Sequence, residues 1–499
     1  MTDIEKRNND GVAKQSSVKV SVIFIQDRSG SMQSVWEETL SGFKAFVNRL
    51  QQEAPARWSF HMLLLGAALT WCWTILGGPR SAYAQGFSNF KQADGRVVLN
   101  ILKEDLEKNY YDPSFGGMDL TGQFKQAQEM INSTTSTGGV FSVIALAFRK
   151  LNDSHTFFLP PSHASRVEYG WQAKAIGDYC YVAAVKPGSD ADGKGLKVGD
   201  LVLSVDGHEL TRENIHDMHY AYYSLSPRLG MQVVARSAGG QERQLDAAAR
   251  ITQGQRRYDL TGDTEDDIWQ LIRDDESESR LYRNRYHETG HDLIIWKMPQ
   301  FDMSVSEVDD AMKRVRKFKT LILDLRGNGG GAVKTLERLA GYFFDRDVKI
   351  ADLKGRKNMK PMMAKSQGGG GYKGQLVVVV DSESASASEI FARLIQLEKR
   401  GALVGDRTAG AVMQARHFGH SLGVDTVIFY GASITTADVI MKDGNSLEHV
   451  GVTPDEFLLP TMEDLASGRD PVLARATALA GKGIEAPEAG ALFPIEWRK

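Results

Sequence analysis

The sequence predicts a multi-domain α/β protein. Its 499 residues exceed one ordinary core and correspond to roughly three or four units. Hydrophobic residues make up 42% and charged residues 25% of the chain, as in soluble globular proteins. After the N-terminal region, helical periodicity gives way to short strands with glycine turns, and then to alternating apolar strands and helices. The last pattern predicts an α/β layer with a mainly parallel sheet.

Charge and cysteine content limit the partners that the protein can have. The net charge is −3 with both signs mixed along the chain, so there is no electrostatic basis for binding nucleic acid or an anionic membrane surface. Cys72 and Cys180 are the only cysteines. Cys72 lies in a segment that we expect to be removed, which leaves one thiol and no internal disulfide. Cys180, between two tyrosines, is expected in a buried strand.

Residues 18–53 contain a β-branched run, the sequence DRSGSM and an amphipathic stretch. They resemble the first strand, metal loop and first helix of a von Willebrand factor A domain. The resemblance implies part of a magnesium loop at Asp27, Ser29 and Ser31. The other strands and metal loops of that family have no counterpart here. One strand and one helix bury too little surface to fold alone, so residues 1–55 are predicted to be a truncated fragment without a working metal site. A tethered cytoplasmic sensor is the alternative.

Residues 56–84 have the parts of a secretory signal peptide. The apolar run 62–76 (MLLLGAALTWCWTIL) follows Arg57, and an A-x-A sequence ends at Ala84. At about fifteen residues this run is short for a membrane span, which needs roughly twenty. We expect cleavage after Ala84 and export to the periplasm or the extracellular space. An uncleaved membrane anchor at 62–76 and a buried core helix remain as alternatives.

Two units precede the α/β layer. Residues 85–165 have helical periodicity and form a predicted helical domain that ends near two prolines. Residues 166–250, which include YGWQAKAIGDYCYVAAVKPGSDADGKGLKVGDLVLSVDG, resemble a PDZ domain, in which a peptide C-terminus adds a strand to a sheet edge. The resemblance implies a helix over the core, a hairpin, and a carboxylate-binding loop. The helix would span Ser189 to Leu196, and the hairpin would turn at Asp206-Gly207. The carboxylate-binding loop would be Tyr169, Gly170 and Trp171.

The α/β unit is predicted at residues 251–480, with a C-terminal tail at 481–499. It opens with an acidic connecting segment, Gln253 to Arg285, that carries one short helix. Strands are expected at DLIIWKM, TLILDLRG, QLVVVVD and ALVGDRT, and helices at residues 305–315, 333–344 and 387–397. The glycine-rich SQGGGGYKGQ lacks the ending of a phosphate loop and precedes no helix, which argues against nucleotide binding.

Two strings in this unit place chemistry where a strand meets a helix. In LILDLRGNGGG a buried strand runs into Gly329 and Gly330, whose backbone N–H groups are accessible because no side chain intervenes. Such N–H groups form oxyanion holes. In VVVVDSESASASEI small residues let a serine hydroxyl project at a helix N-terminus, which favours a developing oxyanion. Ser384, Ser386 and Ser388 are the candidate nucleophiles.

These strings resemble those of the carboxy-terminal processing (tail-specific) and tricorn-like serine peptidases. The resemblance covers residues 85–499 and implies that Ser386 is the nucleophile, with the Ala387 N–H joining Gly330 in the oxyanion hole. The best-known relatives use a lysine base in a T-x-G-K-G motif. Ala411 occupies that position in this chain, so the Ser/Lys dyad is absent.

A histidine is the expected replacement for the lysine. The sequence LNDSHTFF resembles the serine–histidine pair of tricorn-like peptidases, which implies that His155 is the base and Ser154 a supporting hydroxyl. The sequence LEHVGVTPDEF resembles the family's E-x-x-G-V-x-P-D run and implies that Glu448 orients the base. Histidine titrates near neutrality and can both accept and return a proton.

The H-E-x-x-H pattern at His287 and His291 matches a zinc motif, but Gly290 and the following strand argue against the required helix, so a polar turn is expected. The sequence therefore predicts a serine endopeptidase that needs no metal or cofactor. Its expected substrates are exported polypeptides, recruited by their free C-termini. A catalytically silent peptide-binding protein on the same scaffold is the alternative.

Overall fold

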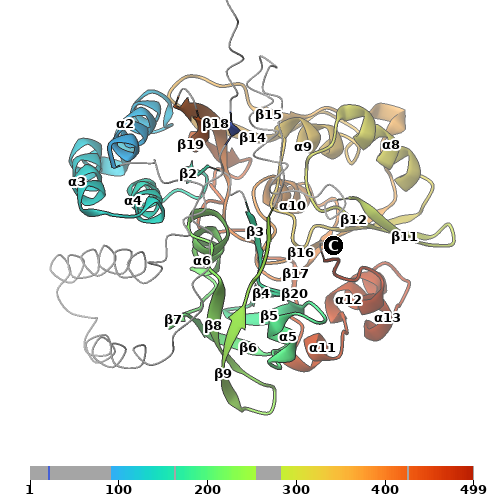
Figure 1. Cartoon of the computed structure of the whole chain (residues 1–499). Coiled ribbons are helices and arrows are strands. Elements are labelled where there is room, and N and C mark those ends of the chain that lie inside the picture. The colour runs from blue at the N-terminus through green and yellow to red at the C-terminus, as the bar shows by residue number, and fades with distance from the viewer. Residues whose placement is uncertain (1–20, 23–91, 162–164, 254–282, 424–425, 498–499) are drawn as a thin grey trace, which may run out of the picture.

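The computed structural model describes residues 21–22, 92–161, 165–253, 283–423 and 426–497 (Figure 1). Asp27, Ser29 and Ser31 lie outside the described residues, and so does the signal-like run 62–76. Within the predicted fragment 1–55 only strand β1 (Ser21–Val22) is described, and it pairs in parallel with β19.

A six-stranded sheet forms the centre of the α/β unit, in the order β11-β12-β13-β16-β17-β20. Every neighbouring pair is parallel except β11 with β12, which confirms the predicted mainly parallel sheet. Leu321, Ile322 and Leu323 of β13 are all fully buried because both faces of the sheet are covered. The strands span Arg285–Thr289 (β11), Leu293–Lys297 (β12), Thr320–Asp324 (β13), Gln375–Val380 (β16), Ala402–Gly405 (β17) and Glu456–Phe457 (β20).

Helices cover both faces of this sheet (Figure 1). Leu323 packs with α8, α9 and α10 on one face, and its neighbour Ile322 packs with α12 and α13 on the other. Helix α8 begins at a capping box, in which Ser304 and Glu307 each satisfy a backbone N–H of the other. The helices span Val305–Val315 (α8), Val333–Ala340 (α9), Ala387–Leu397 (α10), Met462–Ala466 (α11), Pro471–Leu479 (α12) and Ala486–Ala491 (α13).

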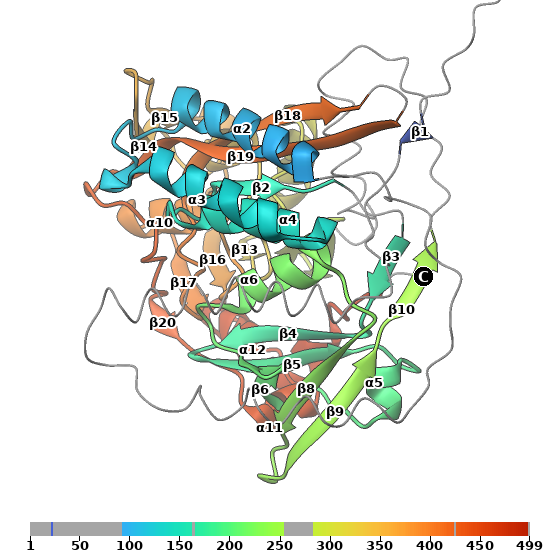
Figure 2. The same cartoon turned by 60° about the vertical axis from the view of Figure 1, so that its left-hand side comes forward.

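A second sheet, which the sequence patterns did not indicate, is built around the long strand β19. Tyr430 and Ala432 of β19 pack against the three N-terminal helices, which lie in front of the sheet in Figure 2. The strands are Phe157–Leu159 (β2), Val348–Gly355 (β14), Met362–Ala364 (β15), Met413–Leu422 (β18) and Thr426–Met441 (β19). The helices are Gln92–Asn109 (α2), Leu120–Ser133 (α3) and Thr137–Arg149 (α4), with a single turn at Phe115–Gly117 (η1). Strand β2 joins this helical region to β19.

Residues 165–253 form a small antiparallel sheet unit below the central sheet (Figure 2). The strand order is β4-β5-β6-β8-β9, so β4 is an edge strand. Its elements are Ser165–Glu168 (β3), Trp171–Ile176 (β4), Tyr179–Val185 (β5), Asp190–Gly193 (α5), Leu201–Val205 (β6), His208–Glu209 (β7), Ile215–His219 (α6), Tyr220–Leu225 (η2), Gly230–Arg236 (β8), Glu242–Ala248 (β9) and Arg250–Gln253 (β10). The resemblance of this unit to a PDZ domain stays a prediction.

Two predicted helices are shorter than the sequence suggested. Helix α9 ends at Ala340 rather than Phe344, and the N–H groups of Tyr342 and Phe343 bond the carbonyls three residues back, as in a tightened last turn. The helix predicted at Ser189 to Leu196 is reduced to α5, since Gly195 with φ 83° ends it. The short helix expected in the connecting segment lies outside the described residues.

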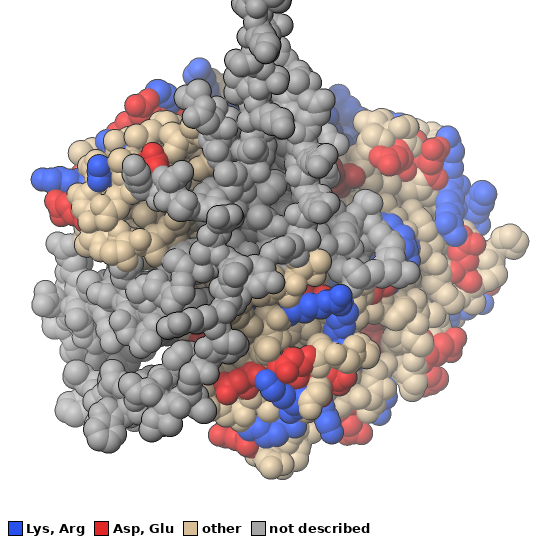
Figure 3. All heavy atoms as spheres, in the orientation of Figure 1, with Lys and Arg blue, Asp and Glu red and all other residues tan. Residues whose placement is uncertain are grey.

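The mixed charge of the surface and the burial of Cys180 agree with the sequence. Lys and Arg side chains are interspersed with Asp and Glu over the described part of the face in Figure 3. Cys180 lies in β5 and is 1% exposed, as expected. Of the helices within the described ranges, none has the length and apolarity to cross a membrane. The glycine run of SQGGGGYKGQ contains a short turn (η3, Gly368–Gly370) before β16.

Replacing Phe391 by Ala is expected to destabilise the α/β unit by roughly 3–5 kcal/mol, because the cavity left behind cannot fully collapse. Phe391 is fully buried in α10, with ring centroids 6.2 Å from Phe301 and 5.6 Å from Phe343. The check is the urea unfolding midpoint of the two proteins. Phe457→Ala is the control, because Phe457 is 58% exposed and its loss is expected to change stability by about 0.5 kcal/mol or less. Equal effects of the two substitutions would contradict this account.

Candidate active site

Ser386 lies between the end of β16 and the start of α10. Its φ of 54° and ψ of −116° belong to a conformation that L-residues rarely adopt. The strained turn places Ser386 at the helix N-terminus, where the backbone N–H groups and the helix dipole favour negative charge. A strand-to-helix turn of this kind presents a serine hydroxyl for nucleophilic attack.

The two alternative serines are occupied elsewhere. Ser384 is fully buried, and its hydroxyl donates to the Leu325 carbonyl at 2.9 Å. Ser388 is also fully buried, and its hydroxyl donates to the Asn328 carbonyl at 2.8 Å. Both hydroxyls tie the Ser386 loop to the preceding glycine-rich loop. Ser386 is therefore the serine of this string that faces a histidine.

A continuous chain of side chains joins Ser386 to Glu448. His155 Nε2 lies 3.3 Å from Ser386 Oγ, and His155 Nδ1 lies 2.7 Å from Ser154 Oγ. Ser154 Oγ donates to Glu448 Oε2 at 2.8 Å, and the Ser154 N–H donates to Glu448 Oε1 at 2.8 Å. The 3.3 Å separation is long for a hydrogen bond, as is common before substrate binds. The four residues named from the sequence thus come together in one relay.

Asp153 fixes the loop that carries His155, and the sequence motifs assigned it no role. Its carboxylate accepts from the N–H groups of His155 at 2.8 Å and Thr156 at 3.1 Å, and from the Thr435 hydroxyl at 2.7 Å. The available signal was the Asp-Ser-His order, since Asp at a turn commonly accepts from the N–H two residues on. Asp153 thereby attaches the His155 loop to β19.

The environment of His155 favours the neutral imidazole. Burial lowers the pKa of His155 below its usual value near 6.5, and the opposing influence of Glu448 and Asp153 is smaller. A neutral imidazole has a free lone pair at neutral pH, so it can accept the proton of Ser386.

The predicted oxyanion donors lie beside Ser386, but one of them is already bonded. A Cβ on Gly330 would come within 2.7 Å of the Ser386 Cβ, so only glycine allows this approach. The Gly330 N–H donates to Asn328 Oδ1 at 2.9 Å. Ala387 is the first residue of α10, where N–H groups have no partner within the helix. Gly329 precedes Gly330 in the same loop.

Glu389 anchors the backbone on the other side of Ser386. Its carboxylate accepts from the N–H groups of Ser386 at 3.0 Å, Gly410 at 2.8 Å and Ala411 at 3.0 Å, and from the Thr408 hydroxyl at 2.5 Å. Burial raises the pKa of Glu389 to about 7, more than these donors lower it. Glu389 follows Ser386 by three residues, which is the spacing of a capping box, so the sequence could have indicated its bond to the Ser386 N–H. Ala411, at the position where the sequence motif would have a lysine, also accepts from the Ser386 N–H through its carbonyl at 2.9 Å.

The other predicted sites lie apart from this relay. Tyr169, Gly170 and Trp171 are buried at the start of β4. Tyr169 donates its hydroxyl to the Tyr222 carbonyl at 3.2 Å, and the Gly170 carbonyl accepts from the Ser189 hydroxyl at 3.2 Å. The loop has the position in front of an edge strand that a carboxylate loop requires, and its role stays a prediction.

The H-E-x-x-H pattern spans a strand and a hairpin turn. His287 lies in β11, and Gly290 turns the chain with φ 56° before His291. Because no helix is formed, the two imidazoles do not share a helix face, although His287 lies in a strand rather than in the predicted turn. The described ranges contain no group of three or more His, Cys, Asp or Glu side chains that could hold a metal ion.

A cavity of about 550 Å³ adjoins the far side of the relay. Glu448 and Asp153 contribute to its wall, together with the aromatic rings of Tyr110 and Phe115. These two rings are stacked with centroids 5.6 Å apart. His449 borders the cavity, and its Nε2 lies 2.9 Å from the Asn152 carbonyl. His420 binds Asp105 of α2 instead, at 2.5 Å.

Known proteins resemble several parts of this chain. Residues 293–457, which include Ser386 and Glu448, match the model of peptidase family S41. This part of the chain is thus similar to family S41 peptidases. The match and the relatives below confirm the expected resemblance to carboxy-terminal processing and tricorn-like peptidases.

Similar proteins cover different parts of the chain. The tail-specific protease of Haemophilus influenzae is 31% identical over 176 residues, which is 34% of this chain and 25% of that protein. The putative tricorn protease homolog 2 of Streptomyces coelicolor is 25% identical over 419 residues, 79% of this chain and 33% of that protein. The chain thus spans a quarter to a third of the length of these two relatives. The crystal structure of mature CPAF shares the fold, with a TM-score of 0.56 and 15% identity over 75% of this chain and 94% of that one.

The raised pKa of Glu389 predicts a pH dependence of stability. The unfolded carboxyl ionises near 4.5, whereas the folded one holds its proton up to about 7. The free energy of unfolding should therefore fall as pH rises through this window, by up to roughly 3 kcal/mol from this group. Glu389→Gln cannot titrate and should lack this part of the slope. Urea unfolding of both proteins between about pH 4.5 and 7.5 measures it, and parallel stability curves would refute the prediction.

Proposed function

We propose that the protein is a serine endopeptidase that uses Ser386 as nucleophile and His155 as base. The observation that carries this proposal is the relay Ser386–His155–Ser154–Glu448, with separations of 3.3, 2.7 and 2.8 Å. His155 takes the proton of Ser386 as Oγ attacks the scissile carbonyl. The protonated imidazole then gives that proton to the leaving amine, and water releases the acyl-enzyme by the same route.

Ser154 and Glu448 would hold the base in the correct tautomer. Glu448 also accepts from the Val412 N–H at 2.8 Å, so three donors fix its carboxylate. Glu448 is connected to His155 through the Ser154 hydroxyl, which lies between the two side chains, rather than by direct contact. This arrangement supports histidine catalysis in a chain where Ala411 replaces the lysine.

The oxyanion would be stabilised by the N–H groups of Ala387 and of the Gly329–Gly330 loop. Because the Gly330 N–H now donates to Asn328, it has to leave that amide oxygen to serve this role. The same bond is the observation that favours the rival function, a catalytically silent peptide-binding protein. Labelling of Ser386 by a fluorophosphonate separates the two functions, since only a reactive serine is labelled.

The substrates would be exported polypeptides, recruited through a free C-terminus by the small sheet unit. An extended peptide could add to the first part of the edge strand β4, next to the predicted carboxylate loop at Tyr169, Gly170 and Trp171 and ahead of Ala175, whose carbonyl accepts from the Ser382 hydroxyl. Export, to the periplasm or beyond, is proposed on the signal-like run 62–76. The mechanism requires no metal or cofactor.

Ser386→Ala and His155→Ala should each lower kcat for an unstructured reporter polypeptide by a factor on the order of 10⁴ or more. The physical reason is that the first removes the attacking oxygen and the second its base. Cleavage is followed by electrophoresis and mass spectrometry. Ser384→Ala is the comparison variant within the same loop, and it should remain labelled by the fluorophosphonate at Ser386. Parent-like cleavage by Ser386→Ala would exclude the mechanism.

The acid limb of the kcat/KM profile should have an apparent pKa below 6.5. His155 must be neutral to act as base, and its pKa is lowered by burial, so activity persists to lower pH than for an exposed histidine. Initial rates between about pH 4.5 and 8 measure this limb. An acid limb centred above 6.5 would contradict the assigned environment of His155.

A further inference from the structure

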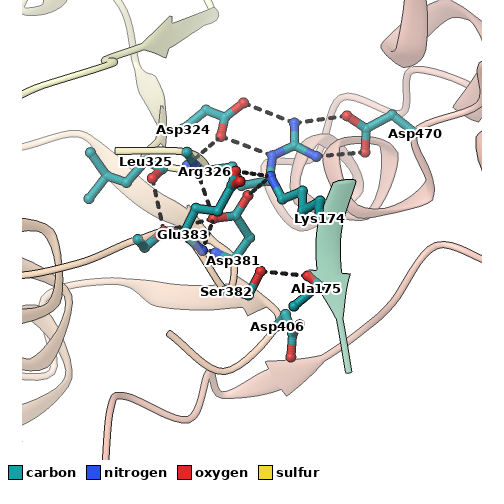
Figure 4. A network of polar contacts seen from close by, with 12 residues as sticks. Lys174, Ala175, Asp324, Leu325, Arg326, Asp381, Ser382, Glu383, Asp406 and Asp470 are labelled. Carbon is teal, nitrogen blue, oxygen red and sulfur yellow. Dashed lines mark hydrogen bonds and ion pairs between the residues drawn. The ribbon is translucent and has the colours of Figure 1, made fainter. Parts of the chain in front are cut away.

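The small sheet unit is attached to the α/β unit through the loop that leads to Ser386. Figure 4 shows Lys174 and Ala175 of β4 side by side with Asp381, Ser382 and Glu383. Lys174 Nζ forms ion pairs with Asp381 Oδ2 and, at 2.9 Å, with Glu383 Oε2. The Ser382 hydroxyl donates to the Ala175 carbonyl. An edge strand of one unit therefore holds the three residues that begin the nucleophile loop of the other.

Asp381 joins this contact to both loops around Ser386. While Oδ2 faces Lys174, Oδ1 accepts from the N–H groups of Gly327 at 2.9 Å and Glu383 at 3.0 Å. Gly327 belongs to the glycine-rich loop and Glu383 to the nucleophile loop. Asp381 is 6% exposed. One buried carboxylate thus fixes the spacing between the two loops.

A short series of hydrogen bonds connects the two loops held by Asp381 to Ser386 and Gly330. The Ala385 N–H donates to the Asn328 carbonyl at 3.0 Å, and Asn328 Oδ1 accepts from the Gly330 N–H. Ala385 directly precedes Ser386. A displacement of Asp381 would therefore be passed to Ser386 and to the Gly330 N–H together.

Lys174 supplies the charge that keeps Asp381 ionised. Burial would raise the pKa of Asp381, but Lys174 lowers it below its usual value. Burial likewise disfavours the ammonium, yet Asp381 and Glu383 raise the pKa of Lys174 above its usual range.

The other cations near Asp381 form their closest bonds elsewhere. Lys297 Nζ donates to the Arg326 carbonyl at 2.6 Å and pairs with Asp324 at 3.3 Å. Arg326 is paired with Asp324 and Asp470 (Figure 4). Lys174, from a different structural unit, therefore makes the ion pair with Asp381.

A second cation of the small sheet unit reaches the opposite side of the site. Arg212 Nη1 donates to Asp406 Oδ2 at 2.9 Å, and Nη2 donates to the Thr408 carbonyl at 3.3 Å. The Thr408 hydroxyl in turn donates to Glu389, which holds the Ser386 N–H. Both backbone segments that flank Ser386 are thus held by side chains of residues 165–253.

We propose that Lys174 is a positioning residue for the peptidase, and that docking of the small sheet unit through the Lys174–Asp381 pair completes the geometry of Ser386 and its oxyanion donors. This inference rests on the proposed function. Removing one partner of a buried pair leaves an uncompensated charge, whereas removing both does not. Loss of the Lys174 ammonium should therefore move the Asp381 carboxylate toward water and pull the two loops with it.

The test compares Lys174→Met, Asp381→Asn and the double variant in the full chain. Lys174→Met is expected to lower the rate of Ser386 labelling by a fluorophosphonate, and kcat for the reporter polypeptide, by about tenfold or more, with KM changed much less. The double variant should recover part of this loss, because it has no isolated buried charge. A merely structural role of Lys174 would lower the folded fraction but leave kcat and the labelling rate per folded molecule unchanged.

Lys194→Met is the matched control. Lys194 pairs with Asp190 and donates to the Asp246 carbonyl within the small sheet unit, away from the α/β unit. In the Lys194→Met variant, Ser386 should be labelled by the fluorophosphonate at the parental rate. Parental labelling of folded Lys174→Met, or a double variant no faster than Lys174→Met, would overturn the proposal. If Lys174→Met does not fold, a folded double variant with no labelling above Ser386→Ala would overturn it.

The outcome separates this inference from the proposed function. If Ser386 of the parent protein is not labelled, or if Ser386→Ala cleaves the reporter as well as the parent does, the proposed function fails. The positioning role of Lys174 then fails with it. If labelling and cleavage depend on Ser386 but not on Lys174, only the positioning role is lost.

Discussion

The carboxylate of Glu389 is the point on which the geometry around Ser386 depends. It accepts hydrogen bonds from Ser386, Thr408, Gly410 and Ala411 while almost completely buried. These contacts fix a backbone turn that is otherwise strained at Ser386. They also hold Gly410 and Ala411 next to Ser386. The turn at Ser386 is therefore fixed by a carboxylate, whichever group serves as the base.

Motifs indicated which side chains come together around Ser386 better than they indicated the sheets. Ser386, His155 and Glu448 lie in short strings whose residue types are dictated by chemistry, so their proximity could be inferred although they are far apart in sequence. The strand β19 (Thr426–Met441) was missed because its length exceeds an ordinary strand and its pairing with β2, β14 and β18 is set by tertiary contacts.

Hydrogen bonds of buried polar groups were the least predictable part of the site. The sequence placed Gly330 correctly next to Ser386, but it could not indicate that Asn328 takes the Gly330 N–H. Such bonds depend on side-chain orientation after the loops have packed. The same holds for Lys174, a residue type usually found at the surface, whose side chain is partly buried where the two units meet.

Strand β19 has a consequence for the order of events during synthesis. His155 and Ser386 are 231 residues apart, and Ser154 and Glu448 are 294 apart. The loop of His155 is fastened to Thr435 of β19 through Asp153, so this fastening has no partner until most of the chain has been made. Contacts of such long range form slowly. A nascent chain that ends before Glu448 contains Ser386 and His155 but lacks one end of the relay, so the complete arrangement can form only late in synthesis.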